Sequence, residues 1–255
     1  MTASLYVHLD TTSNTVVTQG FTPRDFYHGI THQPKNILLL NASSDQGEFE
    51  KHTTMKIIRG YAAITHYFDS LHKNQSLLDK RWIDFTELDL LRELTPLEIS
   101  ELLYFGHMKT HLYSPFFYKL QNNFVFFELE SGVNRTYYRY LDEFYRILAL
   151  KINHLSLELL NSRSTFFRKA QPVEKINIEL LKTLKEAFKE GVLIAIDQSK
   201  LMKNELQIPL IYAEDSPLSV KKINYNSDYL LGHLIYHKDL ASWTLDVEDE
   251  LLGIY

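Results

Sequence analysis

The chain has 255 residues, of which 45% are hydrophobic and 23% charged, the balance of an ordinary folded globular protein. It has only nine Gly and seven Pro but is 13% aromatic, which excludes a disordered chain. The absence of Cys excludes disulfides, thiolate metal sites and Cys nucleophiles. A net charge of −5 does not favour a protein dedicated to nucleic acid.

The first residues, MTASLYVHLDTTSNTVV, lack the basic start and the sustained apolar core of a secretory signal. The longest apolar runs, such as Ile37–Leu40 and Val192–Ile196, are far too short to span a bilayer. These features predict a cytoplasmic protein with no membrane partner.

The N-terminal part predicts a hairpin followed by a buried strand. Leu5–Leu9 alternates in the manner of a strand, and Val16–Phe21 is its expected partner. Pro23–Asp25 interrupts this pattern, so the following FYHGITHQPKN is interpreted as a loop or a single helical turn. Ile37–Leu40 is wholly apolar, which is typical of a strand covered on both faces.

The next elements are predicted to be mainly helical. Apolar residues from Met55 to Leu71 follow helical spacing, so one helix is expected from Thr53. Trp82–Phe85 is a short strand, and Glu87–Leu94 is a short helix. Thr95-Pro96-Leu97-Glu98 then predicts a helix start, with Thr as N-cap, Pro at the first position and Glu closing a capping box.

A β-meander is predicted in the middle of the chain. Phe116–Leu120 and Phe124–Glu130 are expected to pair across Gln121–Asn123, and Arg135–Tyr140 is expected to add a third strand. Leu141–Asn161 follows with the apolar stripe of a long amphipathic helix.

The C-terminal part predicts a helix and further strands. The expected elements are a connector at Ser162–Pro172, a helix at Glu174–Glu190, strands at Val192–Ile196 and Ile208–Ala213, and a hairpin of Tyr229–His237 with Trp243–Val247. The whole pattern predicts an α+β fold with mixed, mainly antiparallel sheets and four to five helices, not a regular doubly wound fold. We expect an N-terminal region at 1–162 with a central aromatic hairpin and a C-terminal region at 163–255, either separate or joined in one compact domain.

The segment Thr95–Tyr140 concentrates aromatic residues and positive charge. Residues 103–170 carry nine Lys and Arg against five Asp and Glu, whereas the segments on both sides are net acidic. The segment holds twelve aromatics: Tyr104, Phe105, Tyr113, Phe116, Phe117, Tyr118, Phe124, Phe126, Phe127, Tyr137, Tyr138 and Tyr140.

Cations between aromatic residues are suited to holding an anionic ligand or stacking single-stranded bases. Strand alternation would place Arg135, Tyr137 and Arg139 on one face. The alternative is that the aromatics pack across strands, with the arginines paired to Glu128 and Glu130. The predicted ligand-binding residues are Arg135, Tyr137, Arg139, Lys109 and Tyr113.

Three histidine pairs have the spacing that places both rings on one face of a helix, namely His28/His32, His107/His111 and His233/His237. The pair His107/His111 has the most helical surroundings, and with a carboxylate such as Glu101 it could bind a divalent metal. None of the pairs has the adjacent Glu of a zinc peptidase. The sequence also has no Gly-x-Ser-x-Gly elbow and no Gly-rich phosphate loop.

The leading hypothesis is a non-catalytic binding or regulatory protein that uses the basic, aromatic surface near residues 104–140 to recognise an anionic or protein partner. It assigns no catalytic residue and no cofactor. One alternative is a metal-dependent enzyme that uses a His-x-x-x-His pair. Another is a self-associating structural protein, because exposed Tyr and Phe side chains are typical of a homodimer surface.

Overall fold

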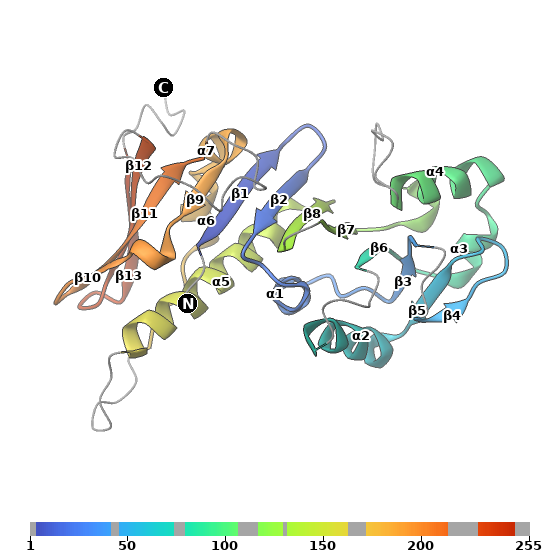
Figure 1. Cartoon of the computed structure of the whole chain (residues 1–255), viewed down its shortest axis with the longest axis horizontal. Coiled ribbons are helices and arrows are strands. Elements are labelled where there is room, and N and C mark those ends of the chain that lie inside the picture. The colour runs from blue at the N-terminus through green and yellow to red at the C-terminus, as the bar shows by residue number, and fades with distance from the viewer. Residues whose placement is uncertain are drawn as a thin grey trace. The chain divides into compact units, whose positions relative to one another are not determined.

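The computed structural model of the chain describes residues 4–41, 46–73, 80–106, 117–129, 132–162, 172–213 and 229–247 (Figure 1). It confirms the α+β class, because helices accompany strands whose described pairs are all antiparallel. Two compact units make up the chain. Unit 1 consists of Met1–Asp10, Val17–Phe21 and Phe144–Tyr255, and unit 2 consists of Thr11–Val16 and Thr22–Glu143. The expected division after residue 162 falls beside a segment outside the described residues and stays a prediction.

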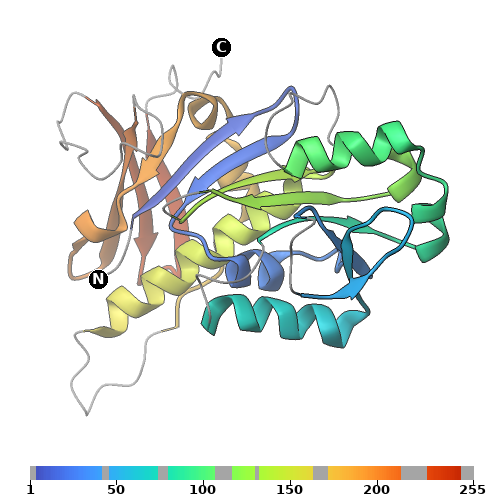
Figure 2. The ribbon, with the colours of Figure 1, turned by 45° about the vertical axis from the view of Figure 1, so that its right-hand side comes forward.

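Unit 2 contains a sheet with the strand order β8-β7-β6-β3-β5-β4. These strands are β8 (Val133–Tyr138), β7 (Phe124–Glu128), β6 (Arg81–Phe85), β3 (Asn36–Leu39), β5 (Lys56–Arg59) and β4 (Glu48–Phe49). Its helices are α1 (Pro23–Gly29), α2 (Tyr61–Lys73), α3 (Leu88–Arg92), α4 (Pro96–Gly106) and the short 3₁₀ helix η1 (Tyr118–Leu120). Figure 2 shows α2 and α4 on opposite sides of these strands.

One face of this sheet is covered by an aromatic core. The indole of Trp82 on β6 stacks on Phe126 of β7, with ring centroids 5.6 Å apart and planes 11° from parallel. Phe26 of α1 and Phe68 of α2 meet the same indole edge-on. Because all four side chains are almost fully buried, aromatic packing fixes α1 and α2 against the sheet.

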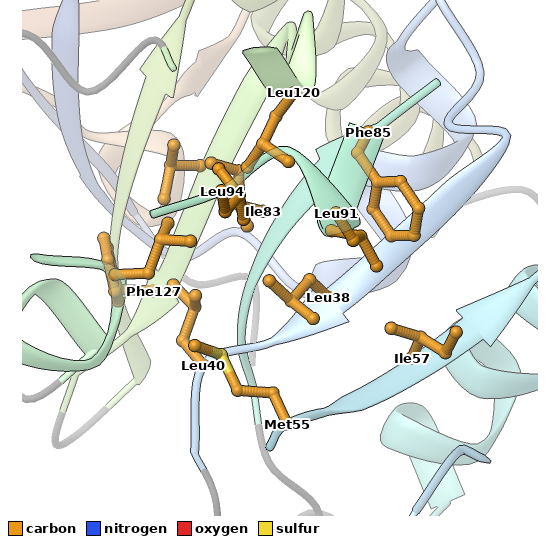
Figure 3. Close-up of a cluster of buried hydrophobic side chains, with 12 residues drawn as sticks. Leu38, Leu40, Met55, Ile57, Ile83, Phe85, Leu91, Leu94, Leu120 and Phe127 are labelled. Atoms are coloured by element: carbon orange, nitrogen blue, oxygen red, sulfur yellow. The ribbon is translucent and has the colours of Figure 1, made fainter. Parts of the chain in front are cut away.

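The opposite face carries a mainly aliphatic core beneath α3 and α4 (Figure 3). Leu38, Ile83 and Val125 come from three adjacent strands, and they contact buried leucines of the two helices, Leu91 and Leu102. Both sheet faces are therefore buried, which explains the continuous apolar runs in these strands.

Both α1 and α4 begin with a capping box. At α4 the Glu98 carboxylate accepts hydrogen bonds from the backbone N–H and the hydroxyl of Thr95, at 2.6 and 2.8 Å, as predicted. At α1, Thr22 and Asp25 form the same reciprocal pair, with Pro23 in the first turn. Pro23–Asp25 thus ends the strand pattern as expected, but it begins a helix of seven residues where a loop or a single helical turn was expected.

Two further predictions in unit 2 were wrong. The helix expected from Thr53 is replaced by β5, and α2 begins only at Tyr61, after Gly60. A strand was expected at Phe116–Leu120, but the described residues of this segment form the 3₁₀ helix η1. β7 therefore pairs with β8, through Phe124 opposite Tyr138, and not with the residues before it.

Unit 1 contains the sheet order β13-β12-β11-β9-β1. Its strands are β13 (Ser242–Val247), β12 (Leu230–His237), β11 (Glu205–Tyr212), β9 (Val192–Ile194) and β1 (Leu5–Asp10), with β2 (Thr15–Gln19) next to β1 and β10 (Lys200–Leu201) next to β11. The helices are α5 (Leu141–Ser162), α6 (Ile178–Lys182) and α7 (Lys185–Glu190), and η3 (Ile196–Gln198) is a 3₁₀ turn. The strands and α5 confirm the predictions, but the single helix expected at Glu174–Glu190 is divided into α6 and α7.

The segment before α6 packs against β12 and β13. The hydroxyl of Tyr236 accepts the N–H of Glu174, and the indole N–H of Trp243 donates to the Glu174 carbonyl at 2.8 Å. The rings of Tyr236 and Trp243 are 5.0 Å apart, so one face of this hairpin is covered. Across the described ranges, no helix has both the length and the apolarity needed to cross a bilayer.

Candidate ligand-binding surface

The structure places only some of the predicted binding residues. Lys109, Tyr113 and the expected metal ligands His107 and His111 lie in 107–116, outside the described residues. Arg135 and Tyr137 lie on β8 and are half-buried.

Arg139 directly follows the end of β8 and is half-buried, like Arg135 and Tyr137. Its backbone N–H donates to Asn123 at 2.8 Å, and its Nε donates to the carbonyl of Asn122 at 2.7 Å. The guanidinium therefore holds the turn that precedes β7. Its charge also acts on Asp84, a buried carboxylate described below.

Tyr137 contributes partly to the core. Its ring meets the buried ring of Phe127 edge-on, with centroids 6.4 Å apart, and packs against the aliphatic cluster under α4. The ring is nevertheless half-buried and not enclosed, so one part of it remains accessible to a partner.

Two arginines flank one aromatic residue across the strands. Phe127 on β7 is paired with Arg81 on β6 and with Arg135 on β8. Directly paired residues of neighbouring strands point to the same face, so both arginines share the face of Phe127. We call Arg81 and Arg135 the basic row. The arrangement of two cations around an aromatic, expected along β8, is thus formed across three strands.

Glu128, one of the two partners considered for the arginines, is paired with a lysine. Glu128 is bound by Lys80 at 2.5 Å, and both side chains are largely buried. Glu130, the other partner considered in the sequence, lies outside the described residues. Among the residues that the structure describes, Arg135 has no ion-pair partner. Lys80, Arg81 and Arg135 thus lie at one end of the β6, β7 and β8 strands, where the Glu128 carboxylate is paired with Lys80.

Most described aromatics of the central segment belong to the core. Phe124, Phe126, Phe127 and Tyr138 are buried, as the packing alternative required. Two tyrosines lie on the surface, Tyr104 at 56% and Tyr140 at 52% exposure. The described surface of this segment therefore presents cations and a few tyrosines, not a continuous aromatic platform.

Asp84 is a buried carboxylate beside the start of β7. It accepts the backbone N–H of Phe124 at 2.6 Å and that of Asn123 at 2.9 Å. Burial raises the pKa of Asp84 to about 7, although these N–H donors and the Arg139 charge act in the opposite direction. The carboxylate aligns the turn before β7 and thereby the strand that carries Phe127.

A second buried carboxylate, Glu143, was not identified from the sequence. It lies in the first turn of α5 and accepts the N–H of Thr31 at 2.7 Å, the Thr31 hydroxyl at 2.5 Å and the N–H of His32 at 3.1 Å. The Nδ1 of His32 also contacts it. The imidazole stacks on the exposed Tyr140, with centroids 5.3 Å apart. No local sequence signal could have shown this contact, because Thr31, which follows the end of α1 at Gly29, is 112 residues away from Glu143 in the chain.

The described histidine pairs are not arranged as metal ligands. α1 ends at Gly29, so His28 and His32 do not share a helix; His28 accepts from Arg24 at 3.3 Å, while His32 contacts Glu143. Within the described ranges, no group of three or more His, Asp or Glu side chains is placed to share a metal ion.

Comparison with known proteins identifies no relative. No protein-family model, no curated protein and no solved structure matches the chain. The function must therefore be argued from the contacts and charges of the chain itself.

Proposed function

We propose that this chain is a binding or regulatory protein that holds an anionic partner against the basic row, Arg81 and Arg135. The observation that carries the proposal is the pairing of both arginines with Phe127 in adjacent strands. The cytoplasmic location and the homodimer expected from the sequence belong to the same proposal.

The sheet fixes the spacing of the two charges. Strands separated by one intervening strand lie about 10 Å apart, so the two Cα atoms have that separation. A guanidinium is planar, remains charged and binds carboxylates or phosphates through two parallel hydrogen bonds. Two guanidinium groups held at this spacing by a rigid sheet suit a partner that carries at least two negatively charged groups close together along its chain.

Tyr137 supports the proposal from the next position on the same face of β8. It lies two residues beyond Arg135, and its ring is half-buried. A partially exposed ring beside a cation offers a flat apolar surface that a base or an aromatic side chain can contact.

The proposal is tested by fluorescence anisotropy with a labelled acidic peptide and a labelled single-stranded RNA. The variants are Arg135→Ala and Arg81→Ala. The matched control is Arg92→Ala, which removes an arginine of α3 whose side chain is 78% exposed and paired only within its own helix. We expect each basic-row variant to weaken binding about tenfold, whereas the control changes it by less than about twofold.

Binding that is equally strong in Arg135→Ala, Arg81→Ala and the control would contradict the proposal, and so would the absence of binding to both probes. If RNA binds, each lost phosphate contact should also reduce the slope of log affinity against log salt by about one. If only the peptide binds, the partner is an acidic protein segment.

A further inference from the structure

Three side chains on one face of the unit 1 sheet form a continuous chain of polar contacts. The Nε2 of His237 lies 2.8 Å from the hydroxyl oxygen of Thr244, and its Nδ1 lies 3.4 Å from a carboxylate oxygen of Glu205. Glu205, His237 and Thr244 come from β11, β12 and β13, respectively. The two ring nitrogens thus face a hydroxyl on one side and a carboxylate on the other.

The strand register brings these residues together. Glu205 is directly paired with His237, and Thr244 is paired with Ile235, two residues before His237 on the same face. Gln207, the next residue of β11 on that face, donates to the second oxygen of the Glu205 carboxylate at 3.2 Å. The carboxylate is therefore held on both sides, and the group rests on regular strands and not on a loop.

We propose that Thr244 is a nucleophile for acyl transfer, with His237 as its general base and Glu205 as the group that orients the imidazole. A hydroxyl within hydrogen-bond reach of a base that is itself oriented by a third group is the arrangement by which proteins activate alcohols. The carboxylate favours the tautomer that carries its proton on Nδ1, which leaves the Nε2 lone pair facing the hydroxyl.

Accessibility agrees with this role. Thr244 is exposed, while the side chains of His237 and Glu205 are only 26% and 33% exposed. The nucleophile can therefore be reached from solvent, and the base and the carboxylate are partly shielded behind it. This shielding strengthens their interaction relative to that of a fully exposed pair.

The proposed acyl transfer moves one proton through His237. The Thr244 oxygen attacks the carbonyl carbon of an ester while its proton moves to Nε2 of His237. The bond from the carbonyl carbon to the leaving oxygen then breaks, and the leaving alcohol takes the proton from Nε2. Water repeats the same sequence on the acylated Thr244 and releases the carboxylic acid. Because a threonine hydroxyl is a weak nucleophile, we expect acyl donors with a good leaving group, such as aryl esters.

The test uses the full chain and p-nitrophenyl acetate, with release of p-nitrophenol and mass spectrometry of the peptide containing Thr244 as readouts. We expect one acetyl group on Thr244. Thr244→Val should abolish it, and Thr244→Ser should restore it. His237→Gln should slow acylation by about a hundredfold, the usual contribution of a general base, and Glu205→Gln by a smaller factor.

The control is His233→Gln, which removes another imidazole from the same face of β12 and should leave acylation of Thr244 unchanged. Circular dichroism of each variant verifies that the sheet is intact. Acetylation confined to lysines or to His237 would overturn the proposal. An acylation rate of Thr244 that is the same in His237→Gln and in the unchanged chain would also overturn it.

Discussion

At the residue scale, two buried carboxylates of unit 2 have opposite electrostatic environments. Asp84 is enclosed beside the aromatic core, and desolvation raises its pKa to about 7. At Glu143, burial also acts to raise the pKa, but the hydrogen bonds from Thr31 and His32 outweigh it and the pKa is lowered. The two groups should therefore change the stability of the chain in opposite directions with pH.

We predict that Asp84 makes the chain less stable as the pH rises. Its folded pKa of about 7 lies above the ordinary value of 3.8, so the folded state holds the proton more tightly. The resulting stability is complete below about pH 4 and is lost as the pH passes about 7, in total on the order of 4 kcal/mol. Urea unfolding at several pH values should show this decline, and Asp84→Asn should remove it.

The control for Asp84 is Asp89→Asn, which changes an 86% exposed carboxylate on α3 and should keep the decline. A decline of equal size in Asp84→Asn would show that another group is responsible. Asp84→Ala should lose about 2 kcal/mol or more at any pH, because two buried N–H groups lose their acceptor.

We predict the opposite dependence for Glu143. Its folded pKa lies below the ordinary value of 4.5, so its stabilisation is present above that pH and is lost as the pH falls through the folded pKa. Glu143→Gln should cost about 2 kcal/mol at neutral pH and should flatten the acid limb of the stability profile. Glu158→Gln, a 54% exposed position on the same helix, should change stability by less than about 0.5 kcal/mol.

At the element scale, local chemistry could be predicted where its signal was complete. Thr95 to Glu98 predicted the start of α4, and Thr22 to Asp25 carries the same signal for α1. The second was missed because Asp stands where Glu is usual and because α1 has only seven residues, too few for a clear apolar stripe. In both cases the proline lies at the position where a helix needs no N–H donor.

Periodicity failed where a strand ran directly into a helix. Met55, Ile58 and Ala62 have helical spacing, yet they do not lie on one helix. Gly60 separates β5, which contains Ile58, from α2, which contains Ala62. Gly60 has a φ of 78°, a value that interrupts both kinds of element. β5 belongs to a sheet that is buried on both faces, so its adjacent residues Ile57 and Ile58 are both apolar and buried. The strand therefore lacks the alternation of apolar and polar residues that identifies a strand in a sequence.

We predict that Gly232 is essential to the β11–β12–β13 sheet. It lies at a register shift opposite Leu210, with a φ of 149°, and an added Cβ would stand 2.1 Å from the carbonyl oxygen of Asp246. Gly232→Ala should cost about 3 kcal/mol or more, because backbone on a neighbouring strand must move.

The control is Gly60→Ala, where φ is also positive but no atom lies within 4 Å of the added Cβ. It should cost only the conformational penalty, about 1 kcal/mol. Equal losses for the two variants in urea unfolding would show that steric contact with β13 is unimportant.

At the scale of the whole molecule, the α+β class could be predicted because strands and helices leave different patterns in the sequence. The strand order could not be predicted, since pairing depends on contacts between residues far apart in the chain. Both proposed sites depend on that order. Strand register pairs Arg81 and Arg135 with Phe127, and it brings Glu205 and Thr244 to His237.

The two tryptophans described above have a spectroscopic consequence. Trp82, in unit 2, is fully buried, and its indole N–H has no hydrogen-bond partner among the described residues. Trp243, in unit 1, is half-buried and donates to a carbonyl. An indole in dry apolar surroundings emits at shorter wavelength than one near water. The emission maximum of Trp82 should therefore lie at shorter wavelength than that of Trp243, so each unit has its own emission band. Trp82→Phe and Trp243→Phe assign the two bands.

The chain passes between the units four times: after Asp10, inside β2, after Phe21 and in the first turn of α5. We therefore expect both bands to change at the same urea concentration. Two separate midpoints would contradict this expectation and would show that one unit unfolds while the other still emits from its folded state. In either case, the short-wavelength edge of the emission spectrum reports on Trp82 and the long-wavelength edge reports on Trp243. A single spectrum therefore measures how cooperatively the two units unfold, without any added label.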